Sequence, residues 1–504
     1  MIFNLGIGAL IFAVWFVTLF FGKDIGLSML LFLTPFSYFL IQILEKNNKI
    51  KDSKAKLLLI PIILLSSTYF IYDNSFFNNL NLIIIPVLVS IMVLGAIGEK
   101  FEINIDTIGK LLGSFFNPLS YIEESMVKFV DNIKEKLKIN VDTNKEKKTK
   151  KVMKAIFITI PLVLVIIALL SSADEVFANI FKGIFNQIIN VFSTINISTT
   201  FLKIIFIAIA FFYFIGLFYY ICIDYEVIDN IDKKQEQKYD NFTIKMILIS
   251  LNIIYLIFCY IQIKSLFIRS TTLNYAHYAR QGFFQLMIVS LINLVTILLA
   301  KKRENREEGK SNKFINYMSL IMIFFTFIIV ISAGVRMYFY ESTYGYTLLR
   351  LLVYCTLFTE CVLFIPTILY ILDKNVNLPK LYFIIITIVY IYMNFANFDN
   401  IIARKNIDRY IETGKIDIYY LEDETGADAI KQMLRILEIE LDEEGIKMQT
   451  IEYLNEVYNN IDREKMDFRN FNISKFLAKN LIAKELQLKN NERIWRNNYI
   501  IMWY

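Results

Sequence analysis

Arginine and tyrosine residues recur together in three polar segments of the C-terminal half of the chain. The arginine guanidinium is a planar fork that binds phosphate or carboxylate through paired hydrogen bonds. The chemistry expected of this set is recognition of an anion, such as a phosphate-bearing lipid headgroup or an anionic wall polymer. We name the set the candidate outer polar site, because the topology derived below places it outside the membrane. Its members are Tyr278, Arg280, Arg336, Tyr340, Tyr344, Arg350, Asp399, Arg404 and Arg409.

The same segments also contain acidic residues, and these offer a second interpretation. Glu341, Asp399, Asp408 and the run Glu422–Glu424 could pair with the arginines and clamp the C-terminal tail onto the rest of the chain. We favour the clamp over a ligand site, because the partners are present in the segments themselves. In either case we expect Arg336, Arg350 and Arg404 to share one polar site at the junction with the tail.

Glu360 is the ionisable residue that stands out inside an apolar run, where it is followed by Cys361. A carboxylate at such a depth is costly, so it is protonated, paired or facing water. One interpretation is transport or proton coupling. The other is a neutral glutamic acid that is hydrogen-bonded to a neighbouring helix through Asn252 or Asn293, and the sequence leaves both open.

Common enzyme chemistries find little support. His277 is the one histidine, which excludes multi-histidine metal sites and the HExxH motif. The four cysteines share no CxxC spacing, and there is no Walker A or GxSxG motif. We therefore expect no metal, no cofactor and no nucleic-acid partner, and we favour a non-enzymatic protein without settling the question. Membrane lipids, an anionic headgroup or an envelope protein are the expected partners.

The elements that must position these residues are apolar runs of nearly membrane-spanning length. Hydrophobic residues make up 56% of the chain, and about eleven runs approach the ~20 residues that cross a bilayer as a helix. The predicted fold class is therefore all-α, a polytopic transmembrane helical bundle over residues 1–395. The predicted spans are Ile2–Phe21, Gly26–Leu44, Leu57–Tyr72, Leu80–Gly98, Val152–Leu170, Thr200–Ile223, Phe242–Ile263, Gly282–Ala300, Phe314–Val335, Leu348–Leu372 and Leu381–Phe395.

Lysine and arginine are concentrated in alternate loops between these spans, and this predicts an orientation. By the positive-inside rule the basic loops are cytoplasmic. The N-terminus is then cytoplasmic, and after an odd number of crossings the tail is extracytoplasmic. The expected location is the cell membrane, and the Ile-, Lys- and Asn-rich composition suggests a bacterium.

Two stretches between the spans are amphipathic, near residues 119–139 and 174–193, and we predict interfacial helices there. The tail, residues 396–504, is predicted to be a small helical domain. Thr425 and Asp428 resemble a helix-capping box. Three apolar stripes at helical spacing would build its core. They comprise Ile430, Met433, Leu434 and Leu437; Ile451, Leu454, Tyr458 and Ile461; and Ile473, Leu477 and Leu481.

Several blocks of the chain resemble a known family. They are Tyr278–Gln285, Arg336–Arg350 and Asn397–Tyr410, together with Asn472–Lys475 and the preceding Phe468 and Arg469. These blocks are similar to those of a bacterial multi-pass membrane family classed as domain of unknown function 4173, which is related to 4153. The resemblance implies a membrane protein whose activity is not established.

Three functions remain in view. The first is a non-enzymatic accessory or signalling component of the cell envelope, in which the bundle positions the outer tail for a partner. The second is a transporter or lipid flippase that uses Glu360 and the outer arginines. The third is a membrane-embedded transferase that acts on a lipid-linked substrate, with His277 as a base.

Overall fold

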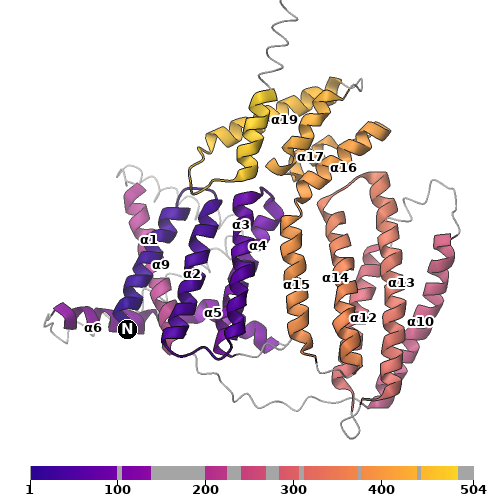
Figure 1. Ribbon diagram of the computed structural model, residues 1–504, viewed down its shortest axis with the longest axis horizontal. Helices are drawn as coiled ribbons and strands as arrows, with labels where there is room; N and C mark the ends of the chain where they lie inside the picture. Colours follow the sequence, from indigo (N-terminus) through magenta and orange to yellow (C-terminus); the bar gives the residue numbers. More distant parts are fainter. Residues whose placement is uncertain are drawn as a thin grey trace, which may run out of the picture. The chain divides into compact units, whose positions relative to one another are not determined.

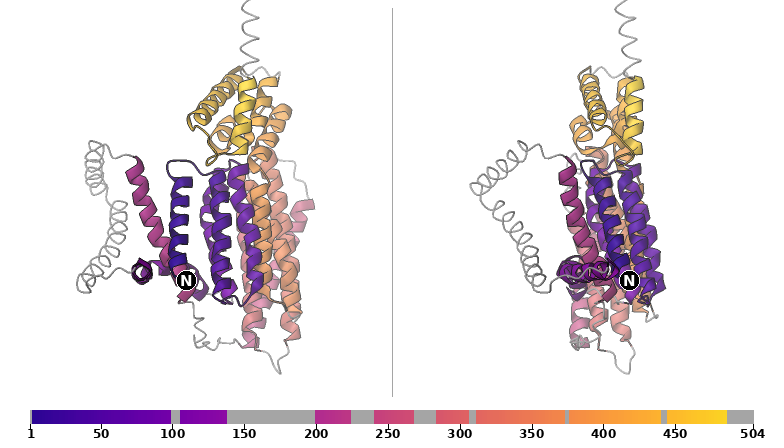
Figure 2. Two further views of the ribbon diagram at one scale, coloured as in Figure 1. Left: turned by 60° about the vertical axis from the view of Figure 1, so that its left-hand side comes forward. Right: turned by 90° about the vertical axis from the view of Figure 1, so that its left-hand side faces the viewer.

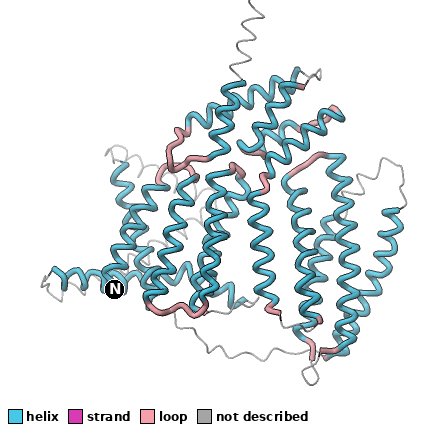
Figure 3. Tube along the Cα trace, in the orientation of Figure 1, coloured by secondary structure: helices cyan, strands magenta, loops and turns pink. Residues whose placement is uncertain are grey.

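The computed structural model of the protein describes residues 2–98, 105–137, 199–223, 240–267, 283–305, 311–372, 376–439 and 444–485. Within these ranges the regular secondary structure is helical and contains no strand (Figure 3). The all-α fold class is therefore confirmed. The predicted span at Val152–Leu170 and the predicted interfacial helix near 174–193 lie outside the described residues.

Each of the other ten predicted spans coincides with a described helix (Figure 1). Nine helical segments of the described part are long and apolar enough to cross a membrane, and α1 adds a shorter apolar helix, Asn4–Phe20. The chain is therefore an integral membrane protein. The helices are α1 (Ile2–Phe20), α2 (Leu27–Lys46), α3 (Leu59–Ile71, after the 3-10 helix Ser53–Leu58), α4 (Ser75–Ile97), α9 (Thr199–Ile223), α10 (Asn241–Phe267), α12 (Phe283–Arg303), α13 (Lys313–Tyr344), α14 (Leu348–Ile371) and α15 (Leu378–Phe395).

The chain divides into two compact units. The first comprises Met1–Ser66, Ile83–Val227 and Phe468–Asn470, and the second comprises Ser67–Leu82, Ile228–Asp467 and Phe471–Tyr504. Helices α3 and α4 each contribute to both units. The predicted division into a bundle at 1–395 and a tail domain at 396–504 stays a prediction.

In the first unit, α1, α2 and α9 pack around aromatic side chains. The Phe12 ring contacts Phe36 and Phe39 of α2 and Phe218 of α9, with ring centroids 5.1 to 6.1 Å apart. Edge-to-face and tilted pairs of this kind are the favoured arrangements of aromatic rings. The side chains of two neighbouring spans thus meet on the apolar face of α1.

Two further helices of the first unit, α5 (Ile105–Ser120) and α6 (Ile122–Leu137), run crosswise to α1 and α9 (Figures 1 and 2). Glycines permit their close approach. A Cβ at Gly216 of α9 would lie 2.4 Å from the Pro118 carbonyl oxygen, and one at Gly6 of α1 would lie 2.1 Å from the Phe129 ring. The helix predicted near 119–139 is therefore present as α6, and its place at a membrane interface stays a prediction.

In the second unit, α13 packs against α10 and α12 on one side and against α14 on another. Buried apolar side chains form two clusters along it, one around Met322 and Phe364 and one around Ile329 and Met337. Helix α15 packs against α14. The tail follows directly after α15 in the sequence.

The tail in the second unit is helical. Its elements are α16 (Phe398–Thr413), α17 (Ile418–Glu424), the 3-10 helix Ala427–Ala429, α18 (Ile430–Met433), the 3-10 helix Leu434–Glu438, α19 (Glu444–Arg463) and helical residues 473–485.

The first two predicted stripes of the tail are largely confirmed, because Ile430, Met433, Leu437, Leu454 and Ile461 are buried. The third stripe is wrong by one position. Leu477 and Leu481 are exposed, whereas Ala478 and Ile482 lie in the core.

Candidate functional site

Part of the candidate outer polar site gathers at the turn between α13 and α14. The Arg350 guanidinium lies 4.3 Å from the centre of the Tyr340 ring, and its Nη1 donates to the Gly345 carbonyl. Tyr340 and Tyr344 have ring centroids 5.1 Å apart. Nη2 of Arg409, from α16 of the tail, donates to the Thr343 carbonyl at 2.5 Å. These side chains join the tail to the turn through carbonyls and rings.

Two other arginines of the set, Arg336 and Arg404, have different surroundings. Arg336 is buried within the helical bundle, where its Nη2 donates to Gln262 Oε1 at 3.0 Å. Arg404 is exposed on α16. Tyr278 and Arg280 lie outside the described residues. Arg336 and Arg350 therefore have different partners, and a site shared by Arg336, Arg350 and Arg404 stays a prediction.

The predicted pairing of aspartates with these arginines is wrong in detail. Asp408 pairs with Arg435, at 2.7 Å, and Asp399 accepts hydrogen bonds from Asn74 and Gly426. Arg350 and Arg409 instead donate to main-chain carbonyls, which helix and turn ends leave without partners, and Arg336 donates to Gln262. Charge alone therefore did not select the partners.

An amide side chain and a tyrosine also fasten the tail to the α13–α14 turn. Asn406 of α16 pairs with the main chain of Tyr346 through two hydrogen bonds of 2.8 Å. The Tyr420 hydroxyl accepts from the Leu348 main-chain N–H at 2.9 Å. Gly345 permits the turn, since its φ is +86° and a Cβ there would lie 2.5 Å from Asn406 Oδ1.

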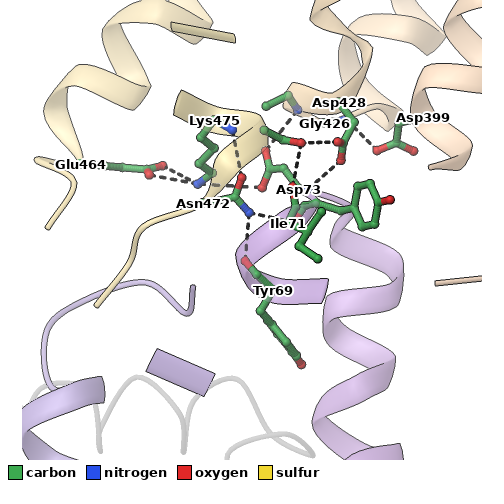
Figure 4. Close-up of polar contacts among 12 residues, drawn as sticks. Tyr69, Ile71, Asp73, Asp399, Gly426, Asp428, Glu464, Asn472 and Lys475 are labelled. Atoms are coloured by element: carbon green, nitrogen blue, oxygen red, sulfur yellow. Dashed lines mark hydrogen bonds and ion pairs between the residues drawn. The ribbon is translucent and has the colours of Figure 1, made fainter. Parts of the chain in front are cut away.

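Three aspartates, Asp73, Asp399 and Asp428, form a second junction, which we name the aspartate hub (Figure 4). Asp73 lies in the short loop between α3 and α4, and its main-chain N–H donates to Asp428 Oδ2 at 2.6 Å. Its Oδ2 accepts from the Ala427 N–H at 3.2 Å. Asp399 Oδ2 accepts from the Gly426 N–H at 3.0 Å, and its Oδ1 accepts from Asn74 at 2.7 Å.

The start of the helix at 473–485 completes this junction. Asn472 Nδ2 donates to the carbonyls of Tyr69 and Tyr72, at 2.9 and 2.8 Å, and thereby satisfies groups exposed at the end of α3. Ser474 Oγ bonds to both the Ile71 carbonyl, at 3.0 Å, and Asp428 Oδ1. Lys475 Nζ lies 3.0 Å from Glu464 and 4.0 Å from Asp73. These contacts also fix the rotation of the helix, which explains the shifted apolar stripe.

Gly426 lets the tail chain approach the α3–α4 loop closely. A Cβ at this position would lie 1.9 Å from the Asp73 carbonyl oxygen, so any other residue would force the two segments apart. The predicted capping box is not formed here. Thr425 Oγ1 donates to the Leu421 carbonyl, and Asp428 accepts from Asp73 and Ser474.

Burial dominates the electrostatics of the hub. It raises the pKa of Asp399 to about 7, partly offset by the hydrogen bond from Gly426. It also raises the pKa of Asp428 to about 6, against the hydrogen bond from Ser474. Removing a carboxylate from water disfavours its charged form. The hub therefore binds protons more tightly than free aspartates do.

A pocket of about 530 Å³ adjoins the hub on the tail. Six of its fifteen lining residues are acidic, among them Glu422, Asp423, Glu452 and Glu456, and Lys475 also lines it. Glu422 Oε2 accepts from Gln449 at 2.7 Å. In the ranges that the structure describes, no group of His, Cys, Asp or Glu side chains is arranged to hold a metal ion.

Glu360, the candidate intramembrane residue, is 2% exposed on α14. Its Oε2 accepts from Ser290 Oγ of α12 at 2.5 Å, so a neighbouring helix does supply a hydrogen bond. The predicted partners are wrong: Asn252 donates to the Met318 carbonyl, and Asn293 pairs with Tyr255 and Thr326. A serine one helical turn before Asn293 takes their place.

Sequence reasoning missed most of the hub. Asp73 and Asn74 occur in a short polar break between two spans, and such breaks carry no pattern of their own. Asn472, Ser474 and Lys475 belong to one of the blocks described above, and the pattern of the sequence assigns them no role. The signal that could have found them is Asn472 itself, because asparagine is a favoured N-cap residue and its Oδ1 accepts from the Lys475 N–H at 2.9 Å.

Comparison with curated proteins and with solved structures gave no match. A family model described as domain of unknown function (DUF4153) matches residues 59–436. This range includes the α3–α4 loop, Asp399 and Asp428, and it ends before α19. The match is to family 4153, and the resemblance to the related family 4173 stays a prediction. Because the matched residues make up most of the chain, the protein belongs to the DUF4153 family.

Proposed function

We propose that the protein is a non-enzymatic accessory or signalling component of the cell envelope. In this proposal the helical bundle of the second unit holds the tail in a defined orientation so that the tail can bind a partner. The N-terminus is cytoplasmic, and the tail is extracytoplasmic.

The observation that carries the proposal is the way the tail is fastened. Two separate loops of the second unit, α3–α4 and α13–α14, bind it through directional hydrogen bonds of buried and half-buried groups. Water replaces these partners when the tail separates, so each hydrogen bond contributes about 0.5–1.5 kcal/mol to docking. A tail held in this way is suited to present a surface, and the pocket of about 530 Å³ lies on it.

The alternatives gain less support from the same residues. A transporter would use Glu360 with the outer arginines. Glu360, however, is buried and accepts a hydrogen bond from Ser290. The guanidinium groups of Arg336 and Arg350 donate to groups of the chain itself. A transferase would need His277, which lies outside the described residues. Neither alternative brings two candidate catalytic groups together among the side chains described.

The proposed orientation rests on the lysine and arginine asymmetry and agrees with the contacts of the second unit. The α3–α4 loop and the α13–α14 turn both contact the tail, so these two loops lie on the tail's side of the membrane. Both are among the loops with few basic residues, as the positive-inside rule expects of the outer side.

Fusions at the C-terminus test the orientation. An alkaline phosphatase fused after Tyr504 should be active, and a fluorescent protein exported at the same position by the general secretory route should remain dark. A fusion in the loop after α2, near Lys51, is the internal control and should give the opposite pattern. The reverse result at both sites would place the tail in the cytoplasm and contradict this part of the proposal.

Purification of the intact protein in mild detergent tests the partner. We expect one protein to co-purify with the wild type at a fixed ratio. Glu452→Lys together with Glu456→Lys should lower its retention about tenfold or more. A partner surface that complements an acidic pocket is basic, so the two introduced lysines should repel it. The matched control, Glu412→Lys with Glu438→Lys, makes the same charge change on exposed tail residues away from the pocket lining and should retain the partner. The proposal fails if the wild type retains no stoichiometric partner.

A further inference from the structure

An apolar groove of about 550 Å³ lies on the surface of the first unit. Leu10, Ile11, Val14 and Trp15 of α1 line it, with Leu31 of α2 and Phe468 from the tail loop. The four α1 side chains are each more than 40% exposed, and Phe468 is 61% exposed. So much exposed apolar surface on membrane-spanning helices is suited to hydrocarbon.

The groove has almost no polar lining. Thr18 is the polar residue on it, and its hydroxyl is engaged with the Val14 carbonyl at 2.7 Å. An extended polypeptide placed here would leave its main-chain groups without partners, at a cost of several kcal/mol each. A hydrocarbon chain carries no such groups. The apolar lining therefore accommodates an acyl chain at no such cost.

The length of the groove fits one leaflet. From Leu10 to Thr18 the helix rises ~1.5 Å per residue, or about 12 Å in all. This is a little under half of the ~30 Å hydrocarbon core. The groove begins near the middle of α1 and ends at the loop that joins α1 to α2, where a headgroup would meet water.

A cation is fixed at that end. Arg469 Nη1 donates to the Thr18 carbonyl at 3.2 Å, and the Arg469 carbonyl accepts from the Ser28 N–H at 2.8 Å, so both α1 and α2 hold it. Its side chain is half-exposed. Lys23 and Asp24 lie in the adjoining loop, and Asp467 precedes Phe468. A guanidinium here complements a phosphate.

We propose that this groove binds an acyl chain of an anionic phospholipid whose phosphate is held at Arg469. The site joins a tail residue to the first two spans, and it gives Phe468 and Arg469 a role that the proposed function does not. The inference is independent of that function, since it concerns a lipid in the membrane plane rather than a partner of the pocket.

Native mass spectrometry of the full-length protein tests it. The protein is purified in mild detergent and mixed with equal amounts of phosphatidylglycerol and phosphatidylcholine that carry the same acyl chains. We expect the wild type to retain phosphatidylglycerol about tenfold better, since its headgroup carries a net negative charge, whereas the choline cation of phosphatidylcholine offsets the charge of its phosphate. Arg469→Ala should abolish the preference, and Arg469→Lys should restore part of it.

Filling the groove separates this site from the general lipid annulus. Val14→Trp should lower the retention of both lipids, whereas Ile209→Trp, an equally large change at an exposed position of α9 outside the groove, should leave it unchanged. Three results would overturn the proposal: equal retention of both lipids by the wild type, an unchanged preference in Arg469→Ala, or an unchanged retention in Val14→Trp.

Discussion

Replacing Asp428 with alanine should loosen the tail from the α3–α4 loop. The carboxylate accepts from the Asp73 N–H and from the Ser474 hydroxyl, and both donors are at least partly buried. Each orphaned donor costs about 1–3 kcal/mol, so the docked tail should lose roughly 2–6 kcal/mol. The substitution also removes a carboxyl group whose charged form burial disfavours, and this offsets a part of the cost. We therefore expect a net loss near the lower end of this range.

Limited proteolysis in detergent micelles measures the effect. The tail of the Asp428→Ala protein should be cut at least about tenfold faster than that of the wild type, since ~1.4 kcal/mol changes the open population tenfold. The isosteric Asp428→Asn keeps one acceptor oxygen and should fall between the two. Graded rates would show that the variants fold and that the contact itself is being measured.

The matched control is Asp408→Ala, which removes another aspartate of the tail. Its partner is Arg435 at 2.7 Å, and both side chains are more than one-third exposed. Exposed ion pairs contribute about 0–1 kcal/mol. Tail cleavage should therefore remain close to the wild-type rate. Equal protection of the Asp428→Ala and Asp408→Ala proteins would contradict a structural role for the hub.

The features of the fold that could be predicted from the sequence are those that depend on local patterns. Spans were predictable because the length of an apolar run is a local property, fixed by bilayer thickness and helix rise. Ten of the eleven predicted spans coincide with described helices for that reason. The first two apolar stripes of the tail were predictable for the same reason. The third was not, because the contacts of Asn472 and Ser474 with α3 determine which face of the last helix is buried.

The hub was not predictable, because it joins residues that are far apart in the chain. Asp73 and Asp428 are separated by 355 positions, and Asn74 and Asp399 by 325. A single sequence gives no measure of which loop meets which. Opposite charges suggested ion pairs for the arginines, but Arg350 and Arg409 donate to the main-chain carbonyls of Gly345 and Thr343, which the end of α13 leaves without helical partners.

Docking of the tail should become stronger as the pH falls from about 7.5 towards 4.5. Burial raises the pKa of Asp399 to about 7 and that of Asp428 to about 6, whereas a free aspartate has a pKa near 3.9. Between these values the docked tail binds more protons than the released tail. Stability then falls as pH rises, by up to about 1.4 kcal/mol per pH unit for each proton taken up.

The neighbouring carboxylates act in the same direction. Asp399 faces the negative charges of Asp428 and Asp73, which also raise its pKa, after burial itself. Glu464 pairs with Lys475, which lies at the edge of the hub and 4.0 Å from Asp73. The gain is complete below the pKa of the free carboxyl, and it is lost as pH rises through the raised pKa values.

Proteolysis of the tail across this pH range, with a protease whose own activity is calibrated at each pH, measures the dependence. Asp399→Asn removes the group with the more strongly raised pKa but keeps an oxygen for the Gly426 N–H, so it should flatten the profile. Asp408→Asn, at the exposed pair, should leave the slope unchanged. A wild-type tail that is cut faster at pH 5 than at pH 7.5 would show that the hub carboxylates are ionised when docked, and would reverse the sign argued here.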